Sequence, residues 1–131
     1  MNILFDASLP PRLARALRIL NAPTHEVVPI RDVLGNDASD RNIQDYLTHK
    51  PGLVVVMDLE ITEHPHRRLA LLEWGCPVCV LSASWLAHKP WDMAWMLIRR
   101  WPAMLAKTDG AAPAIYVVPP PGQGSIRKLA E

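Results

Sequence analysis

Short apolar runs alternate with amphipathic stretches along the whole chain, and this alternation predicts the fold class. The apolar runs predict β-strands over residues 2–5, 26–30, 53–57, 78–81 and 115–118. The run at 53–57 has no polar alternation, which is typical of a strand buried on both faces. Apolar residues at helical spacing predict helices over 10–21, from 39 or 40 up to Pro51, over 65–74 and over 91–107. This order predicts an α/β fold with a mainly parallel sheet and right-handed crossovers.

Capping and breaking residues refine these predicted elements. Ser8 is placed to cap the first helix, and Pro102 is expected to interrupt or kink the last one. Residues 31–38 are polar and include Gly35 and Asn36, so they predict a loop. The helical residues that we expect to face the core include Leu13, Leu17, Leu20, Ile43, Leu47, Leu69 and Leu72.

Composition narrows the domain organisation. A chain of 131 residues, half of them hydrophobic, is sized for one domain with a proper core. The prolines mostly mark predicted element boundaries, but the run from Pro119 to Gly124 predicts a stiff exit from the sheet. We therefore expect a folded domain over residues 1–118 and a Pro/Gly-rich C-terminal tail over residues 119–131.

Charge and hydropathy limit the partners and the location. The formal net charge is +1, so nucleic-acid binding would depend on a local positive patch. No apolar run approaches the roughly 18 residues that span a bilayer. The start lacks a basic segment followed by a long apolar one, so it does not read as a signal peptide. We expect a cytoplasmic protein that has no membrane partner.

Four acidic side chains fall where predicted strands end or where a helix begins. Asp6 follows the strand at 2–5, Asp58 follows the strand at 53–57, Glu60 lies two residues further on, and Asp40 opens a helix. Ligands bind at the carboxyl ends of strands in open parallel sheets. Clustered carboxylates repel one another unless a cation or protons intervene, and their oxygens suit Mg²⁺ or Mn²⁺. The pattern indicates metal-assisted phosphodiester chemistry.

Each of these acids also has a structural interpretation. Asp6 could be a turn or capping residue. Asp40 lies in a first helical turn, where the helix dipole favours a carboxylate by about 0.3–1 kcal/mol. Asp37 is a nearby rival to Asp40, in the preceding loop. Asp58 is the strongest candidate, because five apolar residues lead directly into it.

Three segments in this order resemble a known family. Residues 3–13, Ile-Leu-Phe-Asp-Ala-Ser-Leu-Pro-Pro-Arg-Leu, resemble the opening of short PIN-like domains related to VapC-type toxin nucleases, where an apolar strand precedes Asp-Glu-Asn-Leu-Pro. Residues 25–28 and 38–40 are similar to the second strand and the acidic helix start of that family. Residues 54–60 resemble its third strand and its Thr-Lys-Asp-x-Asp segment. The resemblance covers roughly residues 2–82.

The resemblance implies a fold, an activity and partners. The fold would be a three-layer α/β/α sandwich around a mainly parallel central sheet. The activity would be a Mg²⁺- or Mn²⁺-dependent endoribonuclease, in which Asp6, Asp40, Asp58 and Glu60 hold the metal and serve catalysis. Its products would carry a 5′-phosphate and a 3′-hydroxyl. The protein would be the toxin of a toxin–antitoxin pair, with RNA as substrate, a cognate antitoxin as partner and a homodimer as its expected assembly.

Departures from the family pattern support an alternative function. Ala7 and Ser8 stand where Glu and Asn are usual, and Val56 and Met57 stand where Thr and Lys are usual. Such polar neighbours normally orient metal ligands. The alternative is a catalytically impaired PIN-like scaffold that acts through protein partners. A phosphatase or a receiver domain fits less well, because Ser8 stands where the phosphatase needs a second Asp and the last strand offers no clear lysine for a receiver.

Positive and aromatic residues are candidates for RNA and partner contacts. Arg12, Arg15 and Arg18 share a face of the first helix; either they form a solvated face or the first two, Arg12 and Arg15, bind RNA near Asp6. The pairs Arg99–Arg100 and Arg127–Lys128 could add phosphate contacts. Trp91, Trp95 and Ile98 fall on one face of the last helix and either pack on the sheet or form a partner surface.

The two cysteines, Cys76 and Cys79, have C-x-x-C spacing but a poor context for chemistry. A redox pair needs its first thiolate at a helix N-terminus, whereas a predicted strand follows here. Zinc binding together with His64 and His66 is conceivable, but the spacing matches no common zinc module. We expect neither function.

Overall fold

The computed structural model describes residues 1–58 and 60–131 and shows a three-layer α/β/α architecture. Within those residues, six strands form one sheet in the order β2-β1-β3-β4-β5-β6. The elements follow the chain as β1 (Asn2–Phe5), α1 (Pro11–Asn21), β2 (Glu26–Pro29), α2 (Ile30–Leu34), α3 (Asp40–His49), β3 (Gly52–Met57), α4 (Pro65–Leu72), β4 (Val78–Leu81), the 3₁₀ helix η1 (Ala83–Ala87), α5 (Pro90–Thr108), β5 (Ile115–Val118) and β6 (Arg127–Ala130).

The first five strands are parallel, as the alternation of strands and helices predicts. β1 lies between β2 and β3, while β4 and β5 extend the sheet on the other side of β3. Residues on these strands point alternately to two apolar layers, so both faces of the sheet are buried. In β3, for example, Leu53 and Val55 join one hydrophobic cluster, and Val54 and Val56 join the other. This confirms the predicted α/β class and the mainly parallel sheet.

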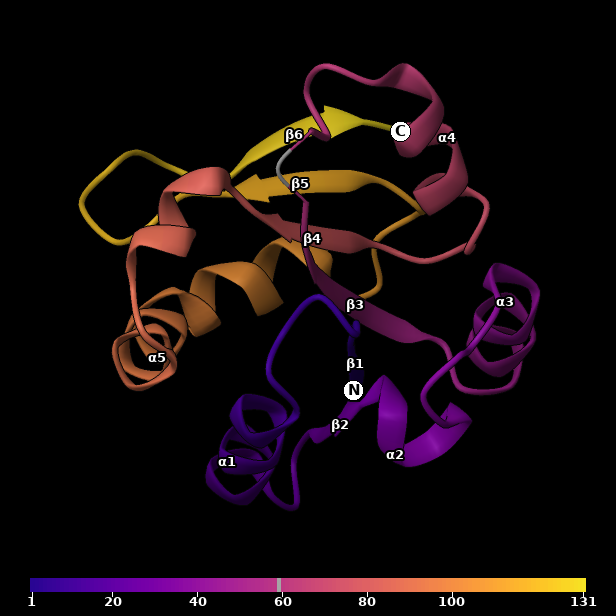
Figure 1. Ribbon diagram of the computed structural model, residues 1–131, viewed down its shortest axis with the longest axis horizontal. Coiled ribbons are helices and arrows are strands. Elements are labelled where there is room, and N and C mark those ends of the chain that lie inside the picture. Colours follow the sequence, from indigo (N-terminus) through magenta and orange to yellow (C-terminus); the bar gives the residue numbers. More distant parts are fainter. Residues whose placement is uncertain (59) are drawn as a thin grey trace.

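Helices cover both faces of the sheet (Figure 1). α1 and α5 lie on one side and α3 and α4 on the other. The first cluster includes Leu13 and Leu17 of α1 and Met96 of α5, and the second includes Ile43 and Leu47 of α3. α1, α3 and α5 are therefore each held by an apolar stripe, whereas α4 has no buried residue and packs through the partly buried Leu71 and Leu72.

Two apolar residues that we expected in the core are exposed. Leu20 of α1 is 66% exposed and Leu69 of α4 is 62% exposed. Each residue lies in a helix that we predicted, but its side chain faces solvent. The buried face of each helix is narrower than the spacing of its apolar residues suggests. Apolar spacing fixes which helix forms better than it fixes the edge of the buried face.

Four other features differ from expectation. Residues 30–34 form the short helix α2 inside a stretch predicted as strand and loop. η1 follows β4, where we predicted no element. α5 continues through Pro102 without interruption. Beyond Val118, the segment expected to leave the sheet turns back, and β6 pairs antiparallel with β5.

Arg100 fastens this returning segment. Its guanidinium donates to the backbone carbonyls of Pro119 (2.9 Å), Pro120 (2.8 Å) and Gly124. The side chain suggested as a phosphate contact therefore supports the turn before β6. Lys128 of β6 is likewise engaged, 3.0 Å from the carboxylate of Glu131. In the part of the chain described above, we find no helix with the length and apolarity needed to cross a membrane.

Candidate active site

Asp6 is fixed by backbone contacts at the carboxyl end of β1. Its N–H donates to the carbonyl of Val55 (3.0 Å), which continues the pairing with β3 one residue beyond the strand. Its carbonyl accepts from the N–H of Leu9 (3.0 Å), and its carboxylate accepts from the N–H of Ser8 (3.2 Å). The turn thus holds the Asp6 carboxylate at the edge of the sheet.

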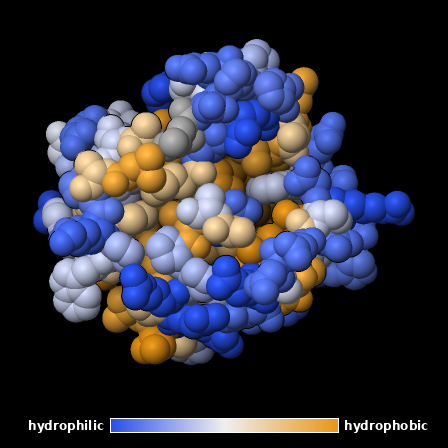
Figure 2. Space-filling view, viewed as in Figure 1, coloured by the Kyte–Doolittle hydropathy of each residue, from blue (hydrophilic) through white to orange (hydrophobic). Residues whose placement is uncertain are grey.

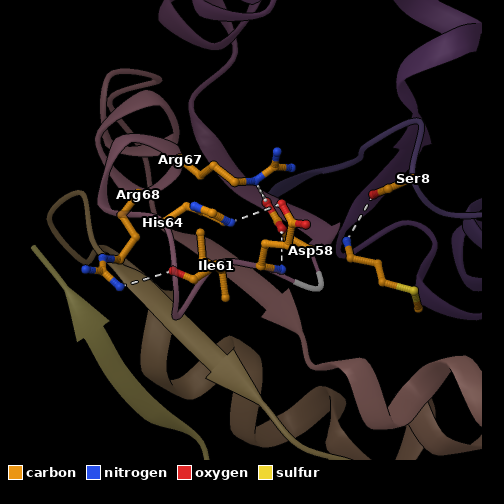
Figure 3. Close-up of polar contacts among 8 residues, drawn as sticks. Ser8, Asp58, Ile61, His64, Arg67 and Arg68 are labelled. Atoms are coloured by element: carbon orange, nitrogen blue, oxygen red, sulfur yellow. Dashed lines mark hydrogen bonds and ion pairs between the residues drawn. The ribbon is translucent and has the colours of Figure 1, made fainter.

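Ser8 connects this turn to the strand that carries Asp58. Its hydroxyl oxygen accepts a hydrogen bond from the N–H of Met57 at 3.0 Å, across 49 positions of sequence (Figure 3). We expected Ser8 to cap α1, but Pro10 holds the cap position and no side chain caps the helix. Ser8, which stands where the family it resembles usually has Asn, therefore connects the turn after β1 to the end of β3.

Asp58 is largely enclosed, with a side chain that is 10% exposed. One carboxylate oxygen, Oδ1, accepts from the N–H of Glu60 at 2.9 Å. The other, Oδ2, accepts from Nε of Arg67 at 2.8 Å. Figure 3 shows the Arg67 side chain reaching from α4 to this carboxylate. The hydrogen bond and the negative charge of Asp58 raise the pKa of Arg67.

Asp40 begins α3, which lies on the same side of the sheet as α4. Ser39 caps α3 by accepting from the N–H of Asn42 (3.1 Å), and Asp40 is the first helical residue. Its carboxylate is exposed and benefits from the positive end of the helix dipole. The helix dipole thus stabilises a carboxylate at the start of α3.

Three of the four predicted acids line one cavity of about 410 Å³. Asp6, Asp40 and Asp58 contribute its carboxylates, and the other lining residues are Ser8, Val56, Met57, His66, Arg67, Ala70, Leu71 and Trp74. Figure 2 shows a hollow on the face seen there, rimmed by hydrophilic side chains with hydrophobic ones in its floor. The cavity brings together two strand ends, one helix start and the first turn of α4.

Glu60 is not among the residues that line this cavity. Its carboxylate lies 3.5 Å from Nε2 of His64, the residue that precedes α4. Sequence analysis also missed His66 and Arg67 as cavity residues. The available signal was Pro65, which marks a helix start directly after the acidic loop and thereby brings the first turn of that helix close to Asp58.

The residues that line the cavity have side chains of the kind that bind a divalent metal, but they are not close enough together to bind one in this structure. Three carboxylates around a cavity are ligands of the kind that Mg²⁺ and Mn²⁺ prefer. Within residues 1–58 and 60–131, however, no three side chains of His, Cys, Asp or Glu lie close enough together to hold an ion. Both Asp58 oxygens already accept hydrogen bonds. The donors fit in kind, and the positive group that contacts Asp58 is Arg67.

The two arginines expected to bind RNA have different surroundings. Arg15 forms an ion pair with Asp32, with Nη2 2.6 Å from Oδ1, which raises the pKa of Arg15. Arg12 lines a separate groove of about 500 Å³ between α1 and α5, together with Lys89 and Trp91. In the part of the chain that the structure describes, neither Arg12 nor Lys89 forms an ion pair.

The tryptophans divide into buried and exposed sets. Trp85 is fully buried and donates from Nε1 to the carbonyl of Val118 at 2.8 Å. Trp91, Trp95 and Ile98 of α5 are 87%, 50% and 46% exposed. These three residues, which we call the α5 apolar face, do not pack on the sheet.

Cys76 and Cys79 are buried free thiols that belong to different apolar clusters. Burial raises the pKa of each thiol to about 12. Both therefore stay protonated near neutral pH, which is the opposite of what redox or zinc chemistry requires.

Comparison with known proteins gives one match. Residues 1–83 match a family model described as a PIN like domain, and this segment contains the whole cavity lining. No curated protein and no solved structure matches the chain.

Proposed function

The chain belongs to the PIN-like domain family, whose members are generally nucleases, and on this premise we propose that it is a metal-dependent endoribonuclease. The observation that carries the proposal is the cavity that Asp6, Asp40 and Asp58 line together. These carboxylates come from two strand ends and a helix start, at the edge where parallel sheets bind ligands. Mg²⁺ or Mn²⁺ would be held by Asp6, Asp40 and Asp58, and Glu60 would join only by leaving His64.

The chain's own residues would bind and orient the RNA and the ion. Asp6 is held by its backbone bonds, and Ser8 attaches the turn after β1 to the end of β3, next to Asp58. Arg67 and His66 supply donors for a phosphate in the same cavity. When bound, a divalent ion supplies an acidified water and neutralises charge on the phosphoryl oxygens.

The test is RNA cleavage by the purified protein with Mg²⁺ or Mn²⁺, and with EDTA as the metal-free control. We expect cleavage that EDTA abolishes. Asp58→Asn should lower the rate by at least about 100-fold, beyond the loss typical of a residue that only supports a ligand. Asp37→Asn is the matched control, because Asp37 lies in the loop before α3 and does not line the cavity. No metal-dependent cleavage, or equal losses in the two variants, would refute the proposal.

We further propose that the nuclease is a toxin that a cognate antitoxin restrains, and that it forms a homodimer. The α5 apolar face supports a protein partner, because exposed tryptophans commonly anchor interfaces. Light scattering of the free protein tests the homodimer. Expression in cells tests the toxin: growth arrest is expected, and co-expression with the protein of an adjacent small gene should relieve it. The double variant Trp91→Ser/Trp95→Ser should lose either the dimer or that relief.

The second candidate is a catalytically impaired scaffold. The ion pair between Arg67 and Asp58 favours it, because a candidate metal ligand is already neutralised. Metal titration separates the two candidates. A rise in melting temperature with Mn²⁺ but no cleavage of RNA would select the scaffold, and both effects together would select the nuclease.

A further inference from the structure

Arg67 donates from Nε to Oδ2 of Asp58, one of the carboxylate oxygens that we propose as metal ligands. We infer that its guanidinium is the built-in counter-ion of the cavity, and that a divalent ion binds only by displacing Arg67 from Asp58 Oδ2. The inference rests on the proposed function, since it concerns the same site, but its test measures ion binding rather than cleavage. It assigns Arg67 a role that its position in α4 alone does not suggest.

The charge around the cavity explains why a cation is present. Asp58 is 10% exposed, and two further carboxylates, Asp6 and Asp40, line the same cavity. Like charges that share a site disfavour one another unless a positive group lies between or beside them. Of the lysines and arginines in the described chain, only Arg67 lines this cavity. An arriving divalent ion would therefore compete with it directly.

The hydrogen bond between Arg67 and Asp58 is of a kind that a metal ion could replace. It joins a single guanidinium nitrogen, Nε, to a single carboxylate oxygen, so it lacks the two parallel bonds of a bidentate pair. The Arg67 side chain is 46% exposed. The next residue differs, because Arg68 donates from Nη1 to the carbonyls of Ile61 (3.1 Å) and Thr62 (3.0 Å) and so fastens the loop before α4. Figure 3 shows Arg67 directed to Asp58 and Arg68 directed to Ile61.

The position of Arg67 in α4 would also allow its side chain, once displaced from Asp58, to contact the substrate phosphate. It is the third residue of α4, after Pro65 has fixed the start of the helix, so its backbone is anchored while its long side chain can change rotamer. A guanidinium released from Asp58 stays beside a cavity that would receive a phosphodiester, and guanidinium groups match phosphate geometry. Arg67 would thus neutralise the carboxylates before an ion binds, and it would contact the anionic substrate after an ion has bound.

Isothermal titration of the full-length protein with Mn²⁺ tests the inference. Arg67→Gln removes the competing charge, so Mn²⁺ should bind about tenfold more tightly than to the original protein. Arg67→Met removes the charge with a different side chain and should do the same, which guards against a folding defect in either variant. Arg67→Lys keeps the charge and should stay within about twofold of the original protein.

Arg15→Gln is the matched control. It breaks another arginine–aspartate pair and changes the net charge equally, but Arg15 does not line the cavity. Its Mn²⁺ affinity should not change. Equal tightening in Arg15→Gln would reduce the effect to net charge and overturn the inference, as would unchanged affinity in both neutral Arg67 variants or no Mn²⁺ binding to any protein.

The inference and the proposed function fail in different ways. Tighter Mn²⁺ binding by Arg67→Gln, without cleavage of RNA by any variant, supports the inference and refutes the nuclease. Metal-dependent cleavage with Mn²⁺ affinity that does not respond to Arg67 supports the nuclease and refutes the inference.

Discussion

Gly52 gives the sharpest prediction, because backbone occupies the space that a side chain would need. Gly52 of β3 is paired in register with Asn2 of β1. A Cβ at position 52 would lie 1.8 Å from the carbonyl oxygen of Asn2 and 2.8 Å from its carbonyl carbon, and both distances are below the 3.0 Å that real Cβ atoms keep. Gly52→Ala must therefore push β1 and β3 apart by more than an ångström at this end.

The cost follows from what the displacement disturbs. Strain in a packed position costs about 1–3 kcal/mol, and weakening of ladder hydrogen bonds adds about 1 kcal/mol for each. The lower entropy of the unfolded alanine chain returns about 0.4–1 kcal/mol. We expect the free energy of unfolding to fall by about 2–4 kcal/mol, which for a chain of this size lowers the melting temperature by on the order of 10 °C.

Thermal unfolding followed by circular dichroism measures this effect. Gly110→Ala is the control, because Gly110 has a φ of +65° in the turn after α5 and nothing within 4 Å of the added Cβ. Its cost is backbone strain alone, about 1–2 kcal/mol. A Gly52→Ala protein as stable as the Gly110→Ala protein would refute the claim that β1 and β3 meet too closely here. Asp6 directly follows β1, so the same displacement should weaken Mn²⁺ binding at the other end of the strand.

Three further predictions test other contacts. Ser8→Ala leaves the N–H of Met57 without its acceptor, so the melting temperature should fall by about 3–8 °C, a loss of about 1–2 kcal/mol; an unchanged value would contradict the bridge. Cys76 and Cys79, with thiol pKa values raised to about 12, should react with a thiol reagent at pH 8 only as fast as the protein unfolds, and rapid labelling of the folded protein would contradict their burial. The free energy of unfolding should also fall as the pH rises above 9.0, because the thiols ionise at lower pH in the unfolded chain than in the folded one. Leu69→Lys should change the free energy of unfolding by less than about 0.5 kcal/mol, since Leu69 is 62% exposed, and a large loss in denaturant titration would restore the expected inward position.

The sheet was predictable because its signal is local. Each parallel strand is a short apolar run whose neighbours in sequence are amphipathic, so existence and order follow from the pattern. β6 gives no such signal, because its residues, Arg127 to Ala130, begin with two charges and pair along only one edge. The helix of residues 30–34 was missed for a related reason: it is barely more than one turn, and its only buried residue is Ile30. Elements stabilised by tertiary contacts leave little trace in sequence.

The candidate site was predictable in part. Acids that end buried strands must emerge at one edge of a parallel sheet, which is why Asp6 and Asp58 reach the same cavity. Asp40 arrives there through the cap of α3, which Ser39 marked in sequence. The contact between Arg67 and Asp58 could not be foreseen, because it depends on how α4 is placed over the sheet and on one side-chain rotamer. Whether the predicted ligands hold metal stays a prediction.

The return of the C-terminal segment to β5 decides where this chain could be shortened. β5 is buried along its whole length, and without β6 its outer edge would present bare backbone donors and acceptors to any neighbouring molecule. Arg127 and Lys128 place positive charge on the outermost strand, which discourages stacking of one copy on another. A fragment that stops at Val118 would keep every acid of the cavity, yet it would expose an aggregation-prone strand edge that residues 127–130 otherwise cover.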